Sequence, residues 1–158
     1  QSGGVVPQPP LELPVPEGSE TISLIPQANI HITPMDLRTA IESRKTLRKY
    51  SEEPLSLEEL SYLLWTTQGV KRVSSQPSTA RTVPSAGARH AFETLVLANR
   101  VEGLTPGLYR YVAIEHQLLN LNASTDIVNK IQLGCLNQPQ ITGSAVTFIW
   151  EAVVERMF

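Results

Sequence analysis

The sequence predicts an α+β fold in which an antiparallel-rich mixed sheet is flanked by helices. Three observations predict this class. Two segments with helix-capping signals occupy the first half of the chain, β-rich apolar runs follow in the second half, and two of these runs are close enough to form a hairpin. With 158 residues and 41% apolar content, the chain can bury one hydrophobic core but is too short for two large domains.

We expect residues 1–27 to form a Pro/Gly-rich N-terminal arm and residues 28–158 to form the domain itself. Proline removes a backbone donor, and glycine adds conformational entropy that folding must remove. The arm is therefore expected to be either extended or a disordered leader, and it could wrap a partner subunit. Weak alternation over residues 21–25 predicts a short edge strand.

The composition argues against several classes of function. A formal net charge of -2 and a pI near 5.9 argue against a nucleic-acid binder, which needs a basic surface. The single cysteine, Cys135, cannot form an internal disulfide, and the three histidines lack metal-ligand spacing. No apolar stretch of the sequence approaches the roughly 20 residues that cross a bilayer. We therefore expect a cytoplasmic protein without a metal, a membrane segment or a nucleic-acid partner.

Residues 33–48 carry the signals of a first helix. Thr33 is a candidate N-cap, Pro34 fits the first helical position, and Asp36 can meet the free amides of the first turn. An apolar stripe at helical spacing follows, made of Leu37, Ile41 and Leu47. This pattern predicts a helix that extends through the basic residues after Ser43.

A second helix is expected between Ser56 and Gly69. Ser56 and Glu59 have the spacing of a capping box, and Gly69 is a natural C-terminal stop. Apolar residues recur between them at helical spacing, namely Leu57, Leu60, Leu63 and Leu64. Residues 70–80 follow and are rich in Ser, Lys and Arg, which predicts an exposed and mobile loop.

β-rich segments and one further helix fill the second half of the chain. We expect an interior strand, a β-hairpin, a helix and a last buried strand, at 92–98, 108–112 with 117–121, 124–136 and 145–154 respectively. Trp150 lies in the last strand and is expected in the core. Because a buried strand then lies almost at the last residue, we expect this chain to be an N-terminal part of a longer domain.

The most informative motif is a basic run, Ser43-Arg44-Lys45-Thr46-Leu47-Arg48-Lys49-Tyr50. A helix would place Arg44 and Arg48 on one face, where two guanidinium groups could hold a single phosphate. The Thr46 hydroxyl between them could hydrogen-bond a polyol chain attached to that phosphate. Alternatively, these cations only interact with the negative end of the helix dipole, which contributes about 0.3–1 kcal/mol each.

A second motif is a loop of small residues, Arg81-Thr82-Val83-Pro84-Ser85-Ala86-Gly87-Ala88-Arg89-His90. The small side chains at 85–88 would let main-chain amides approach a planar ring closely, and Arg81 and Arg89 could add positive charge around it. Alternatively, the segment is only a turn that enters a strand, with a proline for fixed φ and a glycine for freedom. The residues of the loop leave both interpretations open.

Taken together, four segments resemble the nitroreductase superfamily. They are Arg-Lys-Thr-Leu-Arg-Lys-Tyr-Ser at 44–51, Pro-Leu-Ser-Leu-Glu-Glu-Leu-Ser-Tyr-Leu-Leu-Trp-Thr-Thr-Gln-Gly-Val at 54–70, Arg-Thr-Val-Pro-Ser-Ala-Gly-Ala-Arg-His at 81–90 and Gly-Leu-Tyr-Arg-Tyr at 107–111. Motif order and spacing are kept from Ile41 to Trp150. Within the superfamily the segments most resemble the SagB-type dehydrogenase branch, which includes flavin oxidases that convert azolines to azoles.

This resemblance implies a nitroreductase-like fold and a site for flavin mononucleotide (FMN). By the family's motifs, the basic run would hold the phosphate and polar groups of FMN, and the small-residue loop would pack against the isoalloxazine ring, often from the other subunit of a homodimer. The implied cofactor-binding residues are Arg44, Lys45, Thr46, Arg48, Pro84, Ser85, Ala86, Gly87 and Arg89. Lys45 and Thr46 depart from the family pattern Arg-Arg-Ser-x-Arg but keep its charge and hydroxyl. Family members continue beyond the strand that matches Trp150.

The leading hypothesis is an FMN-dependent oxidoreductase that acts as a homodimer on a small-molecule or peptide substrate. The resemblance implies hydride transfer through flavin N5 between NAD(P)H or an organic donor and an acceptor, so no protein acid or base is assigned. Arg48, Lys45 or Arg89 could stabilise the reduced flavin anion. Two alternatives stay open: a truncated, non-catalytic nitroreductase-like scaffold module that uses its Pro-rich arm, and an azoline dehydrogenase that acts on a modified peptide.

Overall fold

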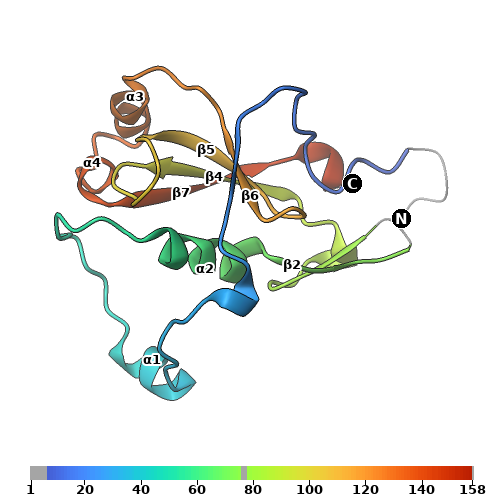
Figure 1. Ribbon diagram of the computed structural model, residues 1–158, viewed down its shortest axis with the longest axis horizontal. Coiled ribbons are helices and arrows are strands. Elements are labelled where there is room, and N and C mark those ends of the chain that lie inside the picture. The colour runs from blue at the N-terminus through green and yellow to red at the C-terminus, as the bar shows by residue number, and fades with distance from the viewer. Residues whose placement is uncertain (1–6, 76–77, 158) are drawn as a thin grey trace.

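A five-stranded sheet forms the centre of the molecule (Figure 1). The computed structural model describes residues 7–75 and 78–157. The strand order is β1-β6-β5-β4-β7, and every pairing within this sheet is antiparallel. The strands are β1 (Thr21–Ser23), β4 (Phe92–Ala98), β5 (Gly107–Val112), β6 (Gln117–Asn120) and β7 (Val146–Ala152). The α+β prediction is confirmed; the sheet itself is antiparallel throughout, and an isolated parallel bridge between Leu55 and Val101 lies outside it.

The helix α2 (Leu57–Gln68) covers one face of this sheet. It begins at the predicted capping box: Glu59 N donates to Ser56 Oγ at 3.1 Å, and Ser56 N donates to Glu59 Oε2 at 2.9 Å. Leu60 and Leu64, one turn apart, are fully buried. Gly69 is the C-cap, as the sequence predicted, and its amide donates to Trp65 O.

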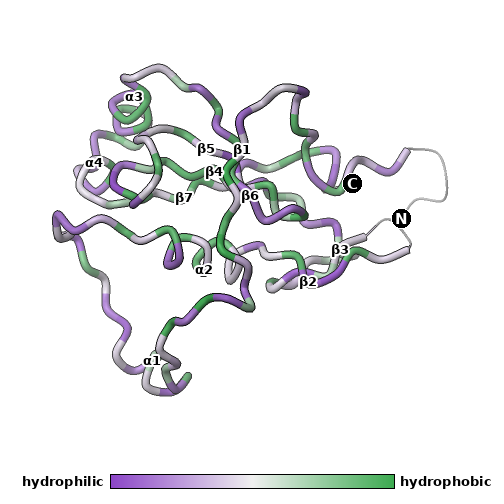
Figure 2. The backbone as a smooth tube through the Cα atoms, viewed as in Figure 1, coloured by the Kyte–Doolittle hydropathy of each residue, from purple (hydrophilic) through white to green (hydrophobic). Residues whose placement is uncertain are grey.

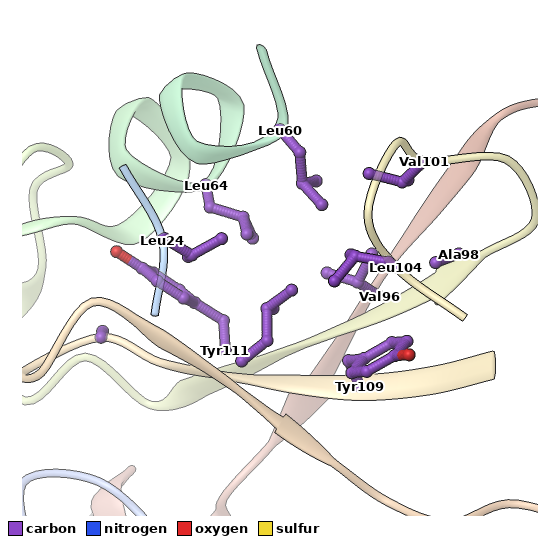
Figure 3. Close-up of a cluster of buried hydrophobic side chains, with 11 residues drawn as sticks. Leu24, Leu60, Leu64, Val96, Ala98, Val101, Leu104, Tyr109 and Tyr111 are labelled. Carbon is purple, nitrogen blue, oxygen red and sulfur yellow. The ribbon is translucent and has the colours of Figure 1, made fainter. Parts of the chain in front are cut away.

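The hydrophobic core lies between α2 and the facing side of the sheet (Figure 3). Because side chains alternate along a strand, Tyr109 and Tyr111 of β5 point toward α2, whereas Arg110 between them points to the opposite face. The buried cluster consists of Leu24, Leu60, Leu64, Val96, Ala98, Val101, Leu104, Tyr109, Tyr111, Ala113 and Leu118. α2 and the sheet are therefore one packed unit, and the opposite face of the sheet carries Arg110 and its polar contacts.

Most predicted strands are confirmed. The interior strand at 92–98 coincides with β4, the predicted hairpin is β5 with β6, and β1 is an edge strand of the sheet. The helix expected over 124–136 is present as the shorter α3 (Ile127–Gly134). The remaining short helices are α4 (Gln140–Gly143), η1 (Gln27–Asn29), η2 (Ala86–Ala88) and η3 (Val154–Arg156).

The last strand, β7, is not buried as expected. It is about as hydrophobic in sequence as β4 (Figure 2). It nevertheless lies at the edge of the sheet, pairs with β4 alone among the described residues, and leaves Trp150 57% exposed. The prediction that Trp150 lies in the core is therefore wrong. An apolar run predicts a strand, but it does not say whether that strand is interior or at an edge.

Residues 70–80, expected as an exposed loop, form most of a hairpin instead. β2 (Val70–Val73) and β3 (Thr79–Arg81) pair antiparallel, with an irregular register between Val70 and Arg72. Thr79 and Arg81 are buried, whereas most of β2 is exposed. The polar residues that suggested a loop lie largely on the solvated side of a two-stranded ribbon, which explains why composition misled the prediction.

The first helix, α1 (Leu37–Ser43), is shorter than expected. Its N-cap is Asp36, which accepts a hydrogen bond from Thr39 N at 3.0 Å, so the Thr33 cap and the Pro34 first position are wrong. The helix ends at Ser43, and α1 lies apart from the sheet and α2 (Figure 1). Leu37 is 74% exposed and Ile41 67% exposed. Without tertiary packing of its apolar face, a helix extends poorly beyond its capped turns.

A half-buried histidine, His116, connects the β5–β6 turn to the segment after β1. His116 Nε2 lies 2.9 Å from Ile25 O, and its Nδ1 lies 2.8 Å from the Tyr111 hydroxyl. A carbonyl oxygen only accepts, so Nε2 carries the hydrogen that it donates to Ile25 O, and in the neutral ring Nδ1 accepts from the Tyr111 hydroxyl. Burial lowers the pKa of His116. Folding therefore favours the neutral imidazole.

We predict that the protein loses stability as the pH falls below about 6.5, the pKa of histidine in an unfolded chain. Because the folded pKa of His116 is lower, the unfolded state binds a proton there that the folded state does not. The contribution of neutral His116 to the free energy of unfolding is complete above that pH and is lost as the pH falls toward the folded pKa.

Urea unfolding at pH 7.5 and 5.5 measures this effect. The loss of unfolding free energy between the two pH values should be smaller for His116→Asn than for the parent. Equal losses in the two proteins would show that His116 does not couple folding to pH. Burial also lowers the pKa of His90, which contributes to the loss common to both.

Candidate functional site

The small-residue loop folds as a tight turn between β3 and β4. Its backbone enters the left-handed region at Gly87 (φ 63°), Ala88 (φ 53°) and His90 (φ 43°). The His90 amide donates to Ser85 Oγ at 2.9 Å and closes the loop on itself. Left-handed conformations cost a non-glycine residue about 1–2 kcal/mol, and clusters of them are typical of functional sites.

An open hollow of about 680 Å³ lies beside this loop. The hollow is lined by Ser85, Ala86, Gly87, Arg89, Ala91, Arg156 and Met157. Pro84 comes directly before the first lining residue and is exposed. Four of the sequence-predicted site residues therefore surround one concave surface. The sequence analysis missed Arg156 and Met157, because both follow a strand without any local motif.

A buried charge cluster lies against the hollow. We define it as Arg81, Glu93, Arg110 and Arg156, all of which are at most 8% exposed. Arg156 Nη2 lies 2.7 Å from Glu93 Oε1, and Arg110 Nη1 lies 3.9 Å from Glu93 Oε2. The Arg156 Nη2 contact is an ion pair whose angles fall short of a regular hydrogen bond. Glu93 alone cannot satisfy three buried guanidinium groups; Glu12 of the arm adds a second negative charge near Arg81, and further acceptors are still required.

The N-terminal arm supplies those acceptors. Arg110 donates to Leu13 O at 2.7 Å and to Pro14 O at 2.9 Å. Arg156 Nε donates to Pro10 O at 2.9 Å. In return, Leu13 N donates to Glu93 Oε1 at 2.9 Å. Residues 10–14 of the arm thus bind the sheet face opposite α2, whereas residues 21–23 form the edge strand β1 and Leu24 belongs to the core on the α2 side. The domain division at residue 27 stays a prediction.

Arg81 also belongs to the arm contacts. Its Nη2 donates to Leu11 O at 3.2 Å and its Nε donates to Thr79 Oγ1 at 3.3 Å. Burial lowers the pKa of its guanidinium. The expectation that Arg81 adds charge around a ring at the loop is therefore wrong, because its side chain is buried under the arm.

The basic run lies far from the loop within this chain. The basic run leads from α1 into the N-terminal end of α2. The β2–β3 hairpin, which leads to the small-residue loop, follows the C-terminal end of α2 (Figure 1). Residues 44–50 are exposed and not helical, so the prediction that a helix face carries Arg44 and Arg48 together is wrong. Among the described residues, no side-chain hydrogen bond or ion pair is formed by Arg44, Lys45, Thr46 or Arg48. Their guanidinium, ammonium and hydroxyl groups are available to a ligand or a second chain.

Other kinds of site find little support in the described residues. A second hollow of about 290 Å³ adjoins Tyr50, but Glu53 and Glu59 line it and disfavour a phosphate there. Within residues 7–75 and 78–157, no three His, Cys, Asp or Glu side chains are grouped as metal ligands. The same residues contain no helix with the length and apolar character to cross a membrane.

Comparison with known proteins gives a consistent result. The model of the Nitroreductase family matches residues 41–157, which is most of the chain. A protein of Methanocaldococcus jannaschii, provisionally named nitroreductase MJ1384, is 30% identical over 125 residues. The alignment covers 79% of this chain and 61% of that protein, so the chain spans less than two thirds of its relative's length.

Solved structures show the same fold. A structure from Anabaena variabilis, provisionally described as a nitroreductase, has a TM-score of 0.67 at 23% identity and covers 94% of this chain and 27% of that one. A second, from Ralstonia eutropha, has a TM-score of 0.62 at 24% identity and covers 98% and 64%. The Escherichia coli microcin synthetase complex McbBCD has a TM-score of 0.51 at 15% identity and covers 85% and 58%. These identities establish the fold alone.

We predict that the loop is held in its left-handed conformation and does not tolerate a Cβ at Gly87. Gly87→Ala should lower the free energy of unfolding by about 1–2 kcal/mol, because a side chain is strained at φ 63°. Gly103→Ala is the matched control, with φ 77° in a turn before β5 and open space around it, and should cost a similar amount. Hydrogen exchange should show faster exchange of the His90 amide only in Gly87→Ala. A neutral Gly87→Ala variant would mean that the loop is free to change its shape.

Proposed function

The chain belongs to the nitroreductase family, and from this premise we propose that it forms part of an FMN-dependent oxidoreductase. The observation that carries the proposal is the small-residue loop, because Ser85, Ala86, Gly87 and Arg89 line one hollow as the family's flavin loop would require. Because the chain spans only part of its relatives, the cofactor, substrates and partners of the whole protein are proposals. Membership of the SagB-type branch is part of the same proposal.

The residues present fit a flavin. The exposed residues Pro84, Ser85, Ala86 and Gly87 offer backbone without bulky side chains, which a planar ring can approach. Arg89 is half-buried on the hollow and makes no side-chain hydrogen bond among the described residues, so its charge is available to an anionic ligand. When bound, FMN supplies hydride transfer at N5 between NAD(P)H or an organic donor and an acceptor. The chain's own residues bind and orient the cofactor and provide positive charge.

A homodimeric site is proposed because the two motifs lie on opposite sides of α2. The basic run, with Arg44, Lys45, Thr46 and Arg48, is exposed near one end, and the loop follows from the other. In one chain they cannot grip one FMN molecule in this conformation. Two chains can bring the run of one to the loop of the other. The cytoplasmic location stays a prediction from the sequence.

A peptide substrate is the second candidate. The observation that favours it is the fold shared with McbBCD, whose structure holds a truncated pro-MccB17 peptide. If this candidate is right, the complete protein oxidises an azoline in a modified peptide in an FMN-dependent assay. If the protein instead reduces nitroaromatic or quinone compounds with NAD(P)H and leaves azolines unchanged, this candidate is wrong.

We predict that the complete protein binds FMN and that Arg44→Ala/Arg48→Ala weakens binding at least about tenfold. Loss of one charge-assisted phosphate contact is expected to cost on the order of 1.4 kcal/mol, which corresponds to a factor of ten in Kd. Quenching of FMN fluorescence measures Kd directly. The matched control is Lys71→Ala/Arg72→Ala, which removes two exposed cations from β2 and should leave Kd within about twofold.

Two results would oppose this assignment. Undiminished FMN affinity in Arg44→Ala/Arg48→Ala would remove the basic run from the site. A colourless complete protein that takes up no added FMN would favour the non-catalytic scaffold hypothesis instead.

A further inference from the structure

The guanidinium of Arg156 connects three separate segments of the chain. Its Nε donates to Pro10 O of the arm at 2.9 Å, and its Nη2 pairs with Glu93 of β4 at 2.7 Å. Its Nη1 donates to His90 O, at the end of the loop, at 3.4 Å. Arg156 is only 2% exposed, yet it borders the hollow beside the loop. One planar group is therefore shared by the arm, the sheet and the candidate site.

The contact with His90 bears on the shape of the loop. The His90 amide donates to Ser85 Oγ at the start of the loop, and its carbonyl accepts from Arg156 at the end. Both backbone polar groups of this left-handed residue are thus fixed. The neighbouring contact of Val153 N with Ala91 O, at 2.7 Å, holds the segment that carries Arg156 against the segment that follows the loop. Arg156 therefore contacts the end of the loop from a segment that is itself hydrogen-bonded beside the loop.

We propose that Arg156 is a positioning residue that holds the loop over residues 85–90 in its cofactor-binding shape, with Glu93 and the arm carbonyl of Pro10 orienting its guanidinium. This proposal rests on the proposed function in taking the loop as the flavin platform. A planar guanidinium with donors in three directions can meet these partners at once, whereas a lysine ammonium cannot span them in the same geometry. The arm is accordingly a component of the site and more than a surface segment.

Arg110 provides a matched control. It pairs with the same Glu93, donates to the same arm through Leu13 O and Pro14 O, and is 5% exposed. Among the described residues, its side-chain contacts reach the arm and β4 but no loop residue. Arg110→Lys therefore perturbs the buried charge cluster and the arm without touching the loop directly. A difference between the two lysine variants isolates the contact to the loop from the general cost of disturbing a buried ion pair.

The test compares Arg156→Lys with Arg110→Lys in the complete protein. Thermal unfolding, hydrogen exchange of the His90 amide without FMN, and Kd for FMN are measured on each variant. Both variants should unfold at lower temperature. Arg156→Lys should speed His90 exchange and raise Kd at least about fivefold, a change well above the factor of two expected of a distant site. Arg110→Lys should leave both within about twofold. Equal effects of the two variants, or unchanged His90 exchange in Arg156→Lys, would overturn the proposal.

The exchange measurement keeps the two proposals separate. If the parent protein binds no FMN, the proposed function fails, and His90 exchange without FMN still decides whether Arg156 positions the loop. If FMN binds but His90 exchange and Kd do not depend on Arg156, only the positioning role fails. Should Arg156→Lys not fold, Arg156→Gln is measured instead, because Glu93 keeps its ion pair with Arg110 in that variant. Arg156→Gln should also speed His90 exchange at least about fivefold, and an unchanged rate there overturns the proposal.

Discussion

The buried carboxylate of Glu93 is the constraint on which the sheet face opposite α2, next to the candidate site, depends. Two arginines approach it from different elements, Arg110 from β5 and Arg156 from η3, and the amide of Leu13 donates to it from the arm. Burying three arginines would be costly without these acceptors and the arm carbonyls. A Pro-rich arm suits this task, because its carbonyls remain free to accept while proline nitrogens need no partners. The arm, the sheet and the loop are consequently parts of one network.

The two faces of the sheet differ in character. On one side, α2 and the strands enclose a hydrophobic core. On the other side, charged residues and the arm support the loop at 85–90, whose hollow is lined by Arg89 and Arg156. The basic run is outside both, exposed between α1 and α2. Under the proposed function, two chains would bring the basic run and the loop to one flavin more simply than one chain would.

The sequence was most informative where signals are local. The capping box of Ser56 and Glu59 and the stop at Gly69 defined α2, and the β-rich apolar run of 92–98 defined β4. Local signals failed where tertiary packing decides. α1 ends at Ser43, and within the described part of the chain its apolar residues Leu37 and Ile41 stay exposed. The polar hairpin of β2 and β3 resembled a loop. The loop motif grouped Ser85, Ala86, Gly87 and Arg89, which line one hollow, and their role in binding flavin stays a prediction. The contacts of Arg156 could not be predicted, because its partners Pro10 and Glu93 are distant from it in sequence and no local motif indicates such long-range contacts.

The most direct test of the central claim is a crystal structure of the complete protein with FMN. The account predicts the isoalloxazine ring against residues 84–87 of one chain, the phosphate on Arg44 and Arg48 of the other chain, and Arg156 still in contact with Glu93 and His90. Flavin bound away from this loop, or a loop that refolds and leaves Arg156 without its contact to His90, would contradict it.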